Sequence, residues 1–269
     1  MSPRHAPWAD APPDFAIGLK PIPEADWLEG GEPDPAVRKD ALYATERAAV
    51  WGETPGSHDA QAEVLALVEA AVGASGHADL SPLYAASRLV PDDLCLMTKS
   101  DAWRLAAISL SAGGFFTAHE ALGKSLAELH GPVPGFDRRF LTRVERIFDG
   151  LREGLILERR NWTVLNTGEL FTPDSAPIRA RLPDITPADA ADALFIRVER
   201  QTLRRLPATG GVLFTIRVWR DPLASLRDDP ARLAAFAKAW RGASADLIAY
   251  KRFDLYDELV EGFLRASGE

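Results

Sequence analysis

The stretch that most constrains the fold is LFIRVERQTLRRLPATGGVLFTIRVW, residues 194–219. Two runs rich in apolar β-branched and aromatic residues flank the turn sequence Pro-Ala-Thr-Gly-Gly, and this pattern predicts a long antiparallel hairpin. Neighbouring residues of a strand point to opposite faces of its sheet. The first strand is therefore expected to have an apolar face with Leu194, Ile196 and Val198, and a polar face with Phe195, Arg197, Glu199 and Gln201.

The rest of the chain alternates between helical and strand patterns without a βαβ repeat. Apolar spacing predicts helices over 35–50, 58–72, 119–129, 136–153, 228–241 and 254–266. A strand pattern begins near residue 83 and predicts a hairpin over 93–110 and a strand over 155–165. A proline-rich loop is expected over 171–188. This order predicts an α+β fold with an antiparallel sheet. Residues 1–33 are expected to form an extended arm on a single domain, 34–269.

The chain of 269 residues has one cysteine, Cys95, and a formal net charge of -8. One thiol excludes a disulfide scaffold, a zinc ribbon and an iron–sulfur cluster held by four cysteines. The negative charge argues against general nucleic-acid binding, which needs clustered positive charge. Because the N-terminal sequence lacks an apolar signal segment and no apolar run approaches a bilayer span, a cytoplasmic protein is expected.

Two histidines lie at the ends of the helix predicted over 119–129. His119 and His130 would be roughly 16 Å apart along that helix, which is too far for both to bind one metal ion. His130 lies in HGPVPG, where prolines limit backbone freedom and would fix the direction of the imidazole. This suits a single axial ligand to haem iron. The alternative is a hydrogen-bonded histidine at the C-terminus of a helix.

The polar face of the first hairpin strand has two interpretations. It could line a cavity in which Glu199 holds a cationic amine and Arg197 meets an anion. Alternatively, both residues could belong to a surface network of cross-strand ion pairs. Thr215 and Arg217 of the neighbouring strand could be cross-strand partners, which is compatible with either interpretation.

Further polar residues lie close to this strand in the sequence or in the predicted sheet. Arg200, Arg204 and Arg205 crowd its end, where they could bind carboxylates or phosphates, or could simply be solvated. Asn161 and Trp162, within RRNW, could line a pocket or belong to the core.

Five blocks carry a resemblance to a known family: ELHGPVPGFD, RRNW and VERQTLRRLPATGGVLFTIR, together with DDLCLM and YKR. They resemble the haem-dependent oxidative N-demethylases, from about residue 15 to about 255. The resemblance implies a PAS-like antiparallel sheet, with its core at about 83–220, and added N- and C-terminal helices. It implies haem (heme b) as cofactor and O2-dependent demethylation of a small secondary amine to a primary amine and formaldehyde. Electrons would come from a separate flavin and iron–sulfur reductase.

The resemblance also implies roles for individual residues. His130 is the expected iron ligand, with His119 as the alternative. Arg200, Arg204 and Arg205 are expected to anchor the haem propionates, and Asn161 and Trp162 to line the cofactor site. Glu199 is expected to hold the alkylammonium near the iron.

Two other hypotheses follow from the same residues. The chain could be a non-catalytic PAS-like sensor of haem or another small ligand, because a fold does not determine a function. It could also be a cofactor-free subunit of a larger complex. The second hypothesis is suggested by AGGFFTAHEALG, residues 112–123, which departs from the family pattern and has Ala121 where a lysine is expected.

Overall fold

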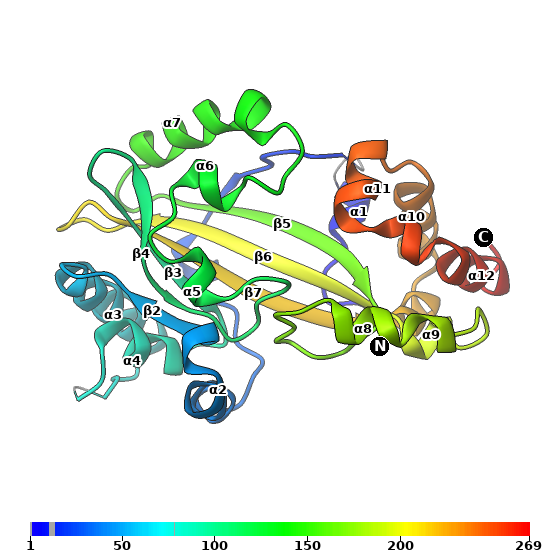
Figure 1. Ribbon diagram of the computed structural model, residues 1–269, viewed down its shortest axis with the longest axis horizontal. Coiled ribbons are helices and arrows are strands. Elements are labelled where there is room, and N and C mark those ends of the chain that lie inside the picture. Colours follow the sequence, from blue (N-terminus) through cyan, green and yellow to red (C-terminus); the bar gives the residue numbers. More distant parts are fainter. Residues whose placement is uncertain (1, 11–13, 78) are drawn as a thin grey trace.

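The computed structural model describes residues 2–10, 14–77 and 79–269, and its central feature is a seven-stranded sheet (Figure 1). The strand order is β1-β5-β6-β7-β3-β4-β2, and every neighbouring pair is antiparallel. The strands are β1 (Lys20–Ile22), β2 (Trp51–Glu53), β3 (Asp93–Lys99), β4 (Trp103–Ser109), β5 (Ile156–Leu165), β6 (Phe195–Arg205) and β7 (Val212–Pro222). The predicted α+β class with an antiparallel sheet is confirmed.

Helices pack around this sheet rather than alternating with parallel strands. They are α1 (Pro7–Asp10), α2 (Pro35–Val50), α3 (His58–Val72), α4 (Pro82–Arg88), α5 (Ala118–Ala121), α6 (Leu126–Leu129), α7 (Thr142–Gly150), α8 (Ala176–Ala180), α9 (Ala190–Ala193), α10 (Pro230–Arg241), α11 (Ala245–Lys251) and α12 (Asp257–Ala266). Within the described residues, no helix combines the length and the apolar character needed to cross a membrane.

The predicted hairpin is formed by β6 and β7, the two longest strands of the sheet. Their register runs from Phe195 opposite Pro222 to Arg205 opposite Val212. The turn is closed by a 2.8 Å hydrogen bond from the Leu206 amide to the Gly211 carbonyl. Gly210 adopts φ +73°, a left-handed conformation that glycine reaches without strain.

Strand alternation divides the sheet into two faces, which we name by β6 residues. The Glu199 face also carries Arg197, Gln201 and Leu203, whereas the Arg200 face carries Ile196, Val198, Thr202 and Arg204. The cross-strand register places Asn161 beside Glu199 and Arg159 beside Gln201. The side chains of Arg159 and Asn161 therefore belong to the Glu199 face.

Different helices cover the two faces. Around Leu203, the Glu199 face packs against apolar residues of α5, α6 and α7. The Arg200 face is covered at one end by α3 and α4, and at the other by α9, α10 and α12 (Figure 1). The apolar core thus lies mainly against the Arg200 face, while the Glu199 face is covered only in part.

The N-terminal arm packs on the Arg200 face. Its strand β1 pairs with β5. Trp27 is fully buried, and its indole nitrogen donates a 3.2 Å hydrogen bond to Thr202 Oγ1. Arg200 donates to the Trp27 carbonyl at 2.7 Å and to Glu158 Oε2 at 2.5 Å. These contacts make the arm part of the structure that supports β6.

Some predicted elements are wrong in detail. Residues 119–129 do not form one helix, because Gly123 adopts φ +78° and a capping box of Ser125 and Glu128 begins a new helix, α6. The start of the 136–153 segment is a π-helical turn, Asp137–Leu141, before α7. Helix α4 occupies the segment near residue 83 where strand character was predicted, α8 lies within the predicted loop over 171–188, and α11 was not predicted. All three are short enough that periodicity alone identifies them poorly.

Candidate functional site

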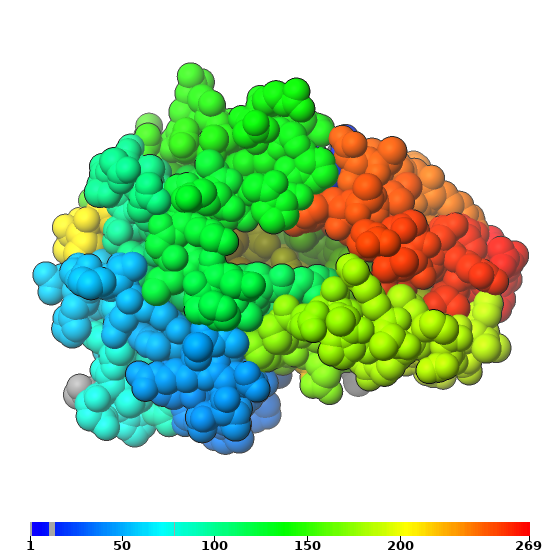
Figure 2. Space-filling model, in the orientation of Figure 1, coloured from blue at the N-terminus to red at the C-terminus, as the bar shows by residue number. Residues whose placement is uncertain are grey.

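The molecular surface has a deep hollow over the Glu199 face (Figure 2). Its rim is formed by the segment around α5 and α6, the segment around α8, and the C-terminal helices near α11. In the same orientation, Figure 1 shows β5 and β6 crossing behind this opening. The Glu199 face of these two strands therefore lies behind the opening, and we call it the floor of the hollow.

Glu199 is the carboxylate of this floor. Its side chain is 25% exposed, so it remains accessible. Oε1 lies 3.4 Å from Arg197 Nε, and Oε2 accepts a 3.2 Å hydrogen bond from Gln201 Nε2. These contacts come from its own strand and orient the carboxylate without enclosing it.

Arg197 connects β6 to two loops at one end of the hollow. The guanidinium is buried and donates to the carbonyls of Leu170, at 3.0 Å, and Ala112. A Cβ added to Gly114 would lie 3.7 Å from this guanidinium, which shows how closely the loop backbone packs on it. Because Arg197 is held by protein carbonyls, its main contribution is to tie Glu199 to the loops that form the rim.

Arg159 lies beside Gln201 in the register and differs from Arg197 in having no acceptor. It is partly buried, and its guanidinium donates no hydrogen bond to any residue that the structure describes. Burial lowers the pKa of Arg159, and the negative charge of Glu199 opposes that effect. A cation in this position can bind an anionic ligand group.

Lys251, the last residue of α11, reaches the outer edge of β5. Its Nζ donates to Asn161 Oδ1 at 2.8 Å and to the Trp162 carbonyl. Burial, together with the charge of Arg159, lowers the pKa of Lys251 to about 7, against the attraction of Glu199. An amine that is partly neutral near pH 7 therefore lies at the edge of β5, beside the Glu199 face.

His130 follows α6 and faces the same region of the sheet. Its Nδ1 is 2.8 Å from the Leu126 carbonyl, and since a carbonyl only accepts hydrogen bonds, Nδ1 carries the proton. The ring stacks on Phe136 with centroids 4.2 Å apart and planes 5° from parallel. Burial lowers the His130 pKa, as does the charge of Arg159. The imidazole is thus neutral, and its Nε2 makes no hydrogen bond with a described residue.

His119 is in a different environment. It is exposed on α5, and its Nδ1 lies 3.2 Å from the Ala48 carbonyl of α2. The neighbouring Ala118 and Ala121 are the residues of α5 that pack against the sheet. The structure therefore does not bring His119 together with Glu199 and Arg159.

The three arginines predicted to anchor propionates are not gathered at the hollow. Arg200 and Arg204 lie on the opposite face, where Arg204 donates to Glu24 Oε1 at 2.6 Å and stacks 4.3 Å from the Trp27 ring. Arg205 shares the face of Glu199 but lies at the hairpin end, where it donates to the Phe148 carbonyl at 3.1 Å. Alternation along β6 explains the separation.

Asn161 and Trp162, the two residues of RRNW predicted to line the cofactor site, lie on opposite faces of the sheet. The side chain of Asn161 is on the Glu199 face and accepts the hydrogen bond from Lys251. Trp162 is buried on the other side, among Trp8, Phe236 and Phe253. Asn161 therefore adjoins the hollow, whereas Trp162 belongs to the core beneath the C-terminal helices.

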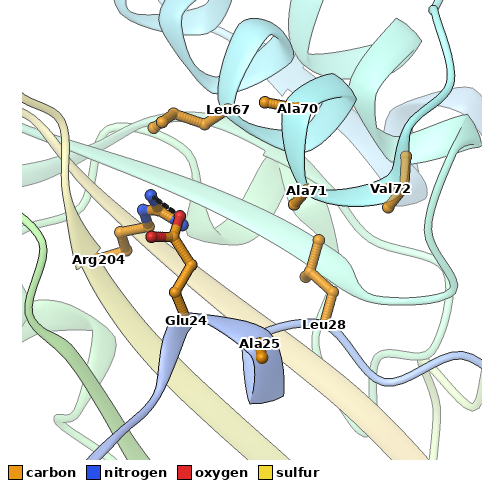
Figure 3. Close-up of a pocket in the computed structure, with 8 residues that line it drawn as sticks. All are labelled: Glu24, Ala25, Leu28, Leu67, Ala70, Ala71, Val72 and Arg204. Carbon is orange, nitrogen blue, oxygen red and sulfur yellow. Dashed lines mark hydrogen bonds and ion pairs between the residues drawn. The ribbon is translucent and has the colours of Figure 1, made fainter.

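A pocket of about 480 Å³ lies on the Arg200 face, between the arm and α3 (Figure 3). Its walls are mostly alanine and leucine side chains, and its charged residues are Glu24 and Arg204, which pair with each other. Its lining has no histidine and no accessible unpaired charge of the kind that Arg159 presents. The groups suited to chemistry are therefore those of the hollow.

Backbone strain also concentrates near the hollow. Among the described residues other than glycine, only Phe115 and Arg252 have positive φ, at 65° and 55°. Phe115 is in the loop between β4 and α5, where its amide donates to the Thr172 carbonyl at 2.8 Å. Arg252 directly follows Lys251. Such conformations are costly for these residue types and cluster at functional sites.

Residues 69–261 match the family model described as haem-dependent oxidative N-demethylase, alpha subunit-like. The chain belongs to this family. The matched range contains His130, Arg159, Glu199 and Lys251, which come from four separate segments of the chain. It excludes the arm that anchors Arg200.

The residues at the hollow fit a haem better than a metal ion held by several side chains. In the described part of the chain, no three His, Cys, Asp or Glu residues are grouped so as to hold a metal ion. Haem needs one fixed histidine nitrogen, cations for its propionates and apolar walls. His130 and Arg159 meet the first two needs, and the apolar cluster around Leu126 and Leu203 adjoins them.

Sequence reasoning missed Arg159 and Lys251, although both lie within the blocks RRNW and YKR that carried the resemblance. Neither block indicates by itself which side chains share a face. Lys251 meets Asn161 across 90 residues of sequence, so only the fold brings them together.

Proposed function

We propose that the hollow binds haem and that Nε2 of His130 would hold its iron. The observation that carries this proposal is the hydrogen bond from Nδ1 to the Leu126 carbonyl. A ligating histidine typically donates its other ring N–H to a carbonyl or carboxylate, which fixes the tautomer and the ring orientation. Stacking on Phe136 restrains the ring further.

Arg159 is proposed to bind a haem propionate. Arg200 and Arg204 are engaged with the arm on the other face, so their positions do not support that role. Arg159 has no protein acceptor and lies close enough to His130 for its charge to lower the histidine pKa. A carboxylate beside Arg159 would satisfy a guanidinium that is otherwise desolvated without a partner.

The proposed reaction is oxidative N-demethylation of a small secondary amine by O2, which yields a primary amine, formaldehyde and water. Haem, when bound, supplies the O2 activation. Glu199 holds the alkylammonium by charge and hydrogen bonding, and Arg197 and Gln201 fix the orientation of its carboxylate. Oxidation of the N-methyl carbon gives a carbinolamine, which collapses to the two organic products.

The reaction consumes two electrons that this chain is not equipped to collect. The sequence has one cysteine and no nucleotide-binding glycine motif, so a separate flavin and iron–sulfur reductase is proposed as the donor. The family description as an alpha subunit supports an assembly of several proteins. The proposed setting is the cytoplasm, where the buried thiol of Cys95 would stay reduced.

The activity is tested with the purified chain reconstituted with hemin, a chemical reductant, O2 and a panel of small N-methylamines. Formaldehyde formed in proportion to the primary amine is expected. A preparation that binds haem but forms no formaldehyde from any member of the panel would contradict the demethylase proposal.

A further inference from the structure

We propose that the ε-amine of Lys251 captures formaldehyde in the hollow, as a reversible carbinolamine and imine on Nζ. This inference rests on the proposed function, because demethylation is what would release formaldehyde there. It assigns a reactive amine to a site for which the family description names only haem and N-demethylation. The consequence is that the electrophilic product is retained close to where it forms.

The position of the amine is the first support. Asn161 Oδ1 and the Trp162 carbonyl accept two hydrogen bonds from Nζ. A neutral amine has two N–H bonds, so both are used and the lone pair remains free. Asn161 is the cross-strand partner of Glu199, which places the lysine at the edge of the floor that would hold the amine substrate.

The charges around Lys251 are the second support. Burial disfavours the ammonium form, and so does Arg159 of β5, while Glu199 of β6 favours it. The rings of Trp162 and Phe253, with centroids 5.4 Å and 5.9 Å from Nζ, also favour the cation. With its pKa lowered to about 7, a large share of this amine is neutral at neutral pH. An ordinary lysine is neutral in only roughly one molecule in 2,500 at that pH.

The chemistry balances without an added oxidant or reductant. The Nζ lone pair forms a bond to the carbonyl carbon, the π electrons move to the oxygen, and a proton passes from nitrogen to oxygen to give the carbinolamine. Loss of water then gives the imine. Water reverses both steps, so formaldehyde can be released again or passed to another nucleophile. Amine nucleophiles activated by desolvation form such adducts with carbonyl compounds.

The test is reductive trapping on the full chain without haem. The protein is treated near neutral pH with a low concentration of formaldehyde and sodium cyanoborohydride, and methylation of each of its six lysines is followed by mass spectrometry. Lys251 is expected to be methylated at least about tenfold faster than the exposed Lys238, because more of its amine is neutral. This advantage should shrink as the pH is raised toward 10.

Lys39 is the matched control for burial. Burial also lowers its pKa, to about 8, but its side chain is enclosed in the protein, 2% exposed, and donates to the Asp92 carbonyl. It is expected to be methylated more slowly than Lys251. Asn161→Leu removes one of the two acceptors and should reduce the selectivity for Lys251.

Methylation of Lys251 no faster than that of Lys238 in the wild-type protein would overturn the proposal. Because trapping needs neither haem nor turnover, this result is independent of the demethylase test. Rapid methylation in a protein that binds no haem would still support a reactive amine at Lys251, and the demethylase proposal alone would fail.

Discussion

The two faces of the sheet carry similar charged residues but use them differently. On the Arg200 face, Arg200 and Arg204 meet acceptors from the N-terminal arm, and the indole of Trp27 fills the space between them. On the Glu199 face, Arg159 has no protein acceptor, and Lys251 is desolvated beside an accessible carboxylate. The first set links the arm to the sheet, and we propose that the second set binds a ligand.

The largest expected effect is on stability. Arg200→Ala removes a guanidinium that is 1% exposed, leaves the carbonyl of Trp27 without this donor, and leaves Glu158 with Arg160 as its remaining ion-pair partner. Breaking such a buried pair should lower the free energy of unfolding by about 3 kcal/mol. Arg159→Gln should change it by less than about 1 kcal/mol, because no protein hydrogen bond is lost. Urea unfolding of both variants measures the difference. Equal losses of unfolding free energy would contradict the proposed difference between the two faces.

The next effect is a pH dependence of stability that comes from Lys251. Its pKa is lowered from 10.5 to about 7 in the folded state, so the unfolded chain binds more protons between these values. The free energy of unfolding should therefore rise with pH over this range. Below pH 7, Lys251 should contribute no further pH dependence. Lys251→Met removes the contribution.

The measurement is the free energy of unfolding of wild type and Lys251→Met at pH 7 and pH 9. The wild type should gain about 1–3 kcal/mol relative to the variant on going to pH 9. Parallel pH profiles for the two proteins would show that Lys251 is not desolvated in the folded state.

A smaller effect is expected on amine binding. Glu199→Gln removes the negative charge but keeps the shape, so the affinity of the haem-loaded protein for a small N-methylammonium should fall at least about tenfold. The matched control is Glu24→Gln, which removes a carboxylate from the other face. Spectral titration with the amine measures both, and a similar loss in Glu24→Gln would argue against Glu199 as the amine ligand.

The smallest effect concerns the haem propionates. Arg159→Gln should weaken haem binding by about fivefold, as expected for one partly solvated charged contact. Arg204→Gln, on the opposite face, should leave haem affinity unchanged. Hemin titration compares the two. A greater loss of haem affinity in Arg204→Gln would indicate instead that arginines at the hairpin end of β6 bind the propionates.

Much of the fold could be predicted because it depends on local patterns. The β6–β7 hairpin, α2 and α3 follow from strand alternation, turn glycines and helical spacing. Alternation also predicted that Ile196 and Val198 would oppose Glu199, and the same rule separates Arg200 and Arg204 from Glu199. Grouping these arginines by their nearness in the sequence ignored that rule.

The rest of the site could not be predicted because it depends on distant contacts. Which face stays open is decided by the helices from the C-terminal part of the chain and by the arm, and no short motif encodes their packing. Lys251 reaches Asn161 only because α11 lies at the edge of β5. The relation between His119 and His130 changed because Gly123 interrupts the predicted helix.

The central claim is that His130 on the Glu199 face binds haem iron. The most direct test is the absorption spectrum of the purified protein during hemin titration, for wild type, His130→Ala and His119→Ala. We expect a Soret band that saturates stoichiometrically in wild type and His119→Ala, and a much weaker, altered band in His130→Ala. An unchanged spectrum and affinity in His130→Ala would contradict it, as would a wild-type protein that gives no Soret band.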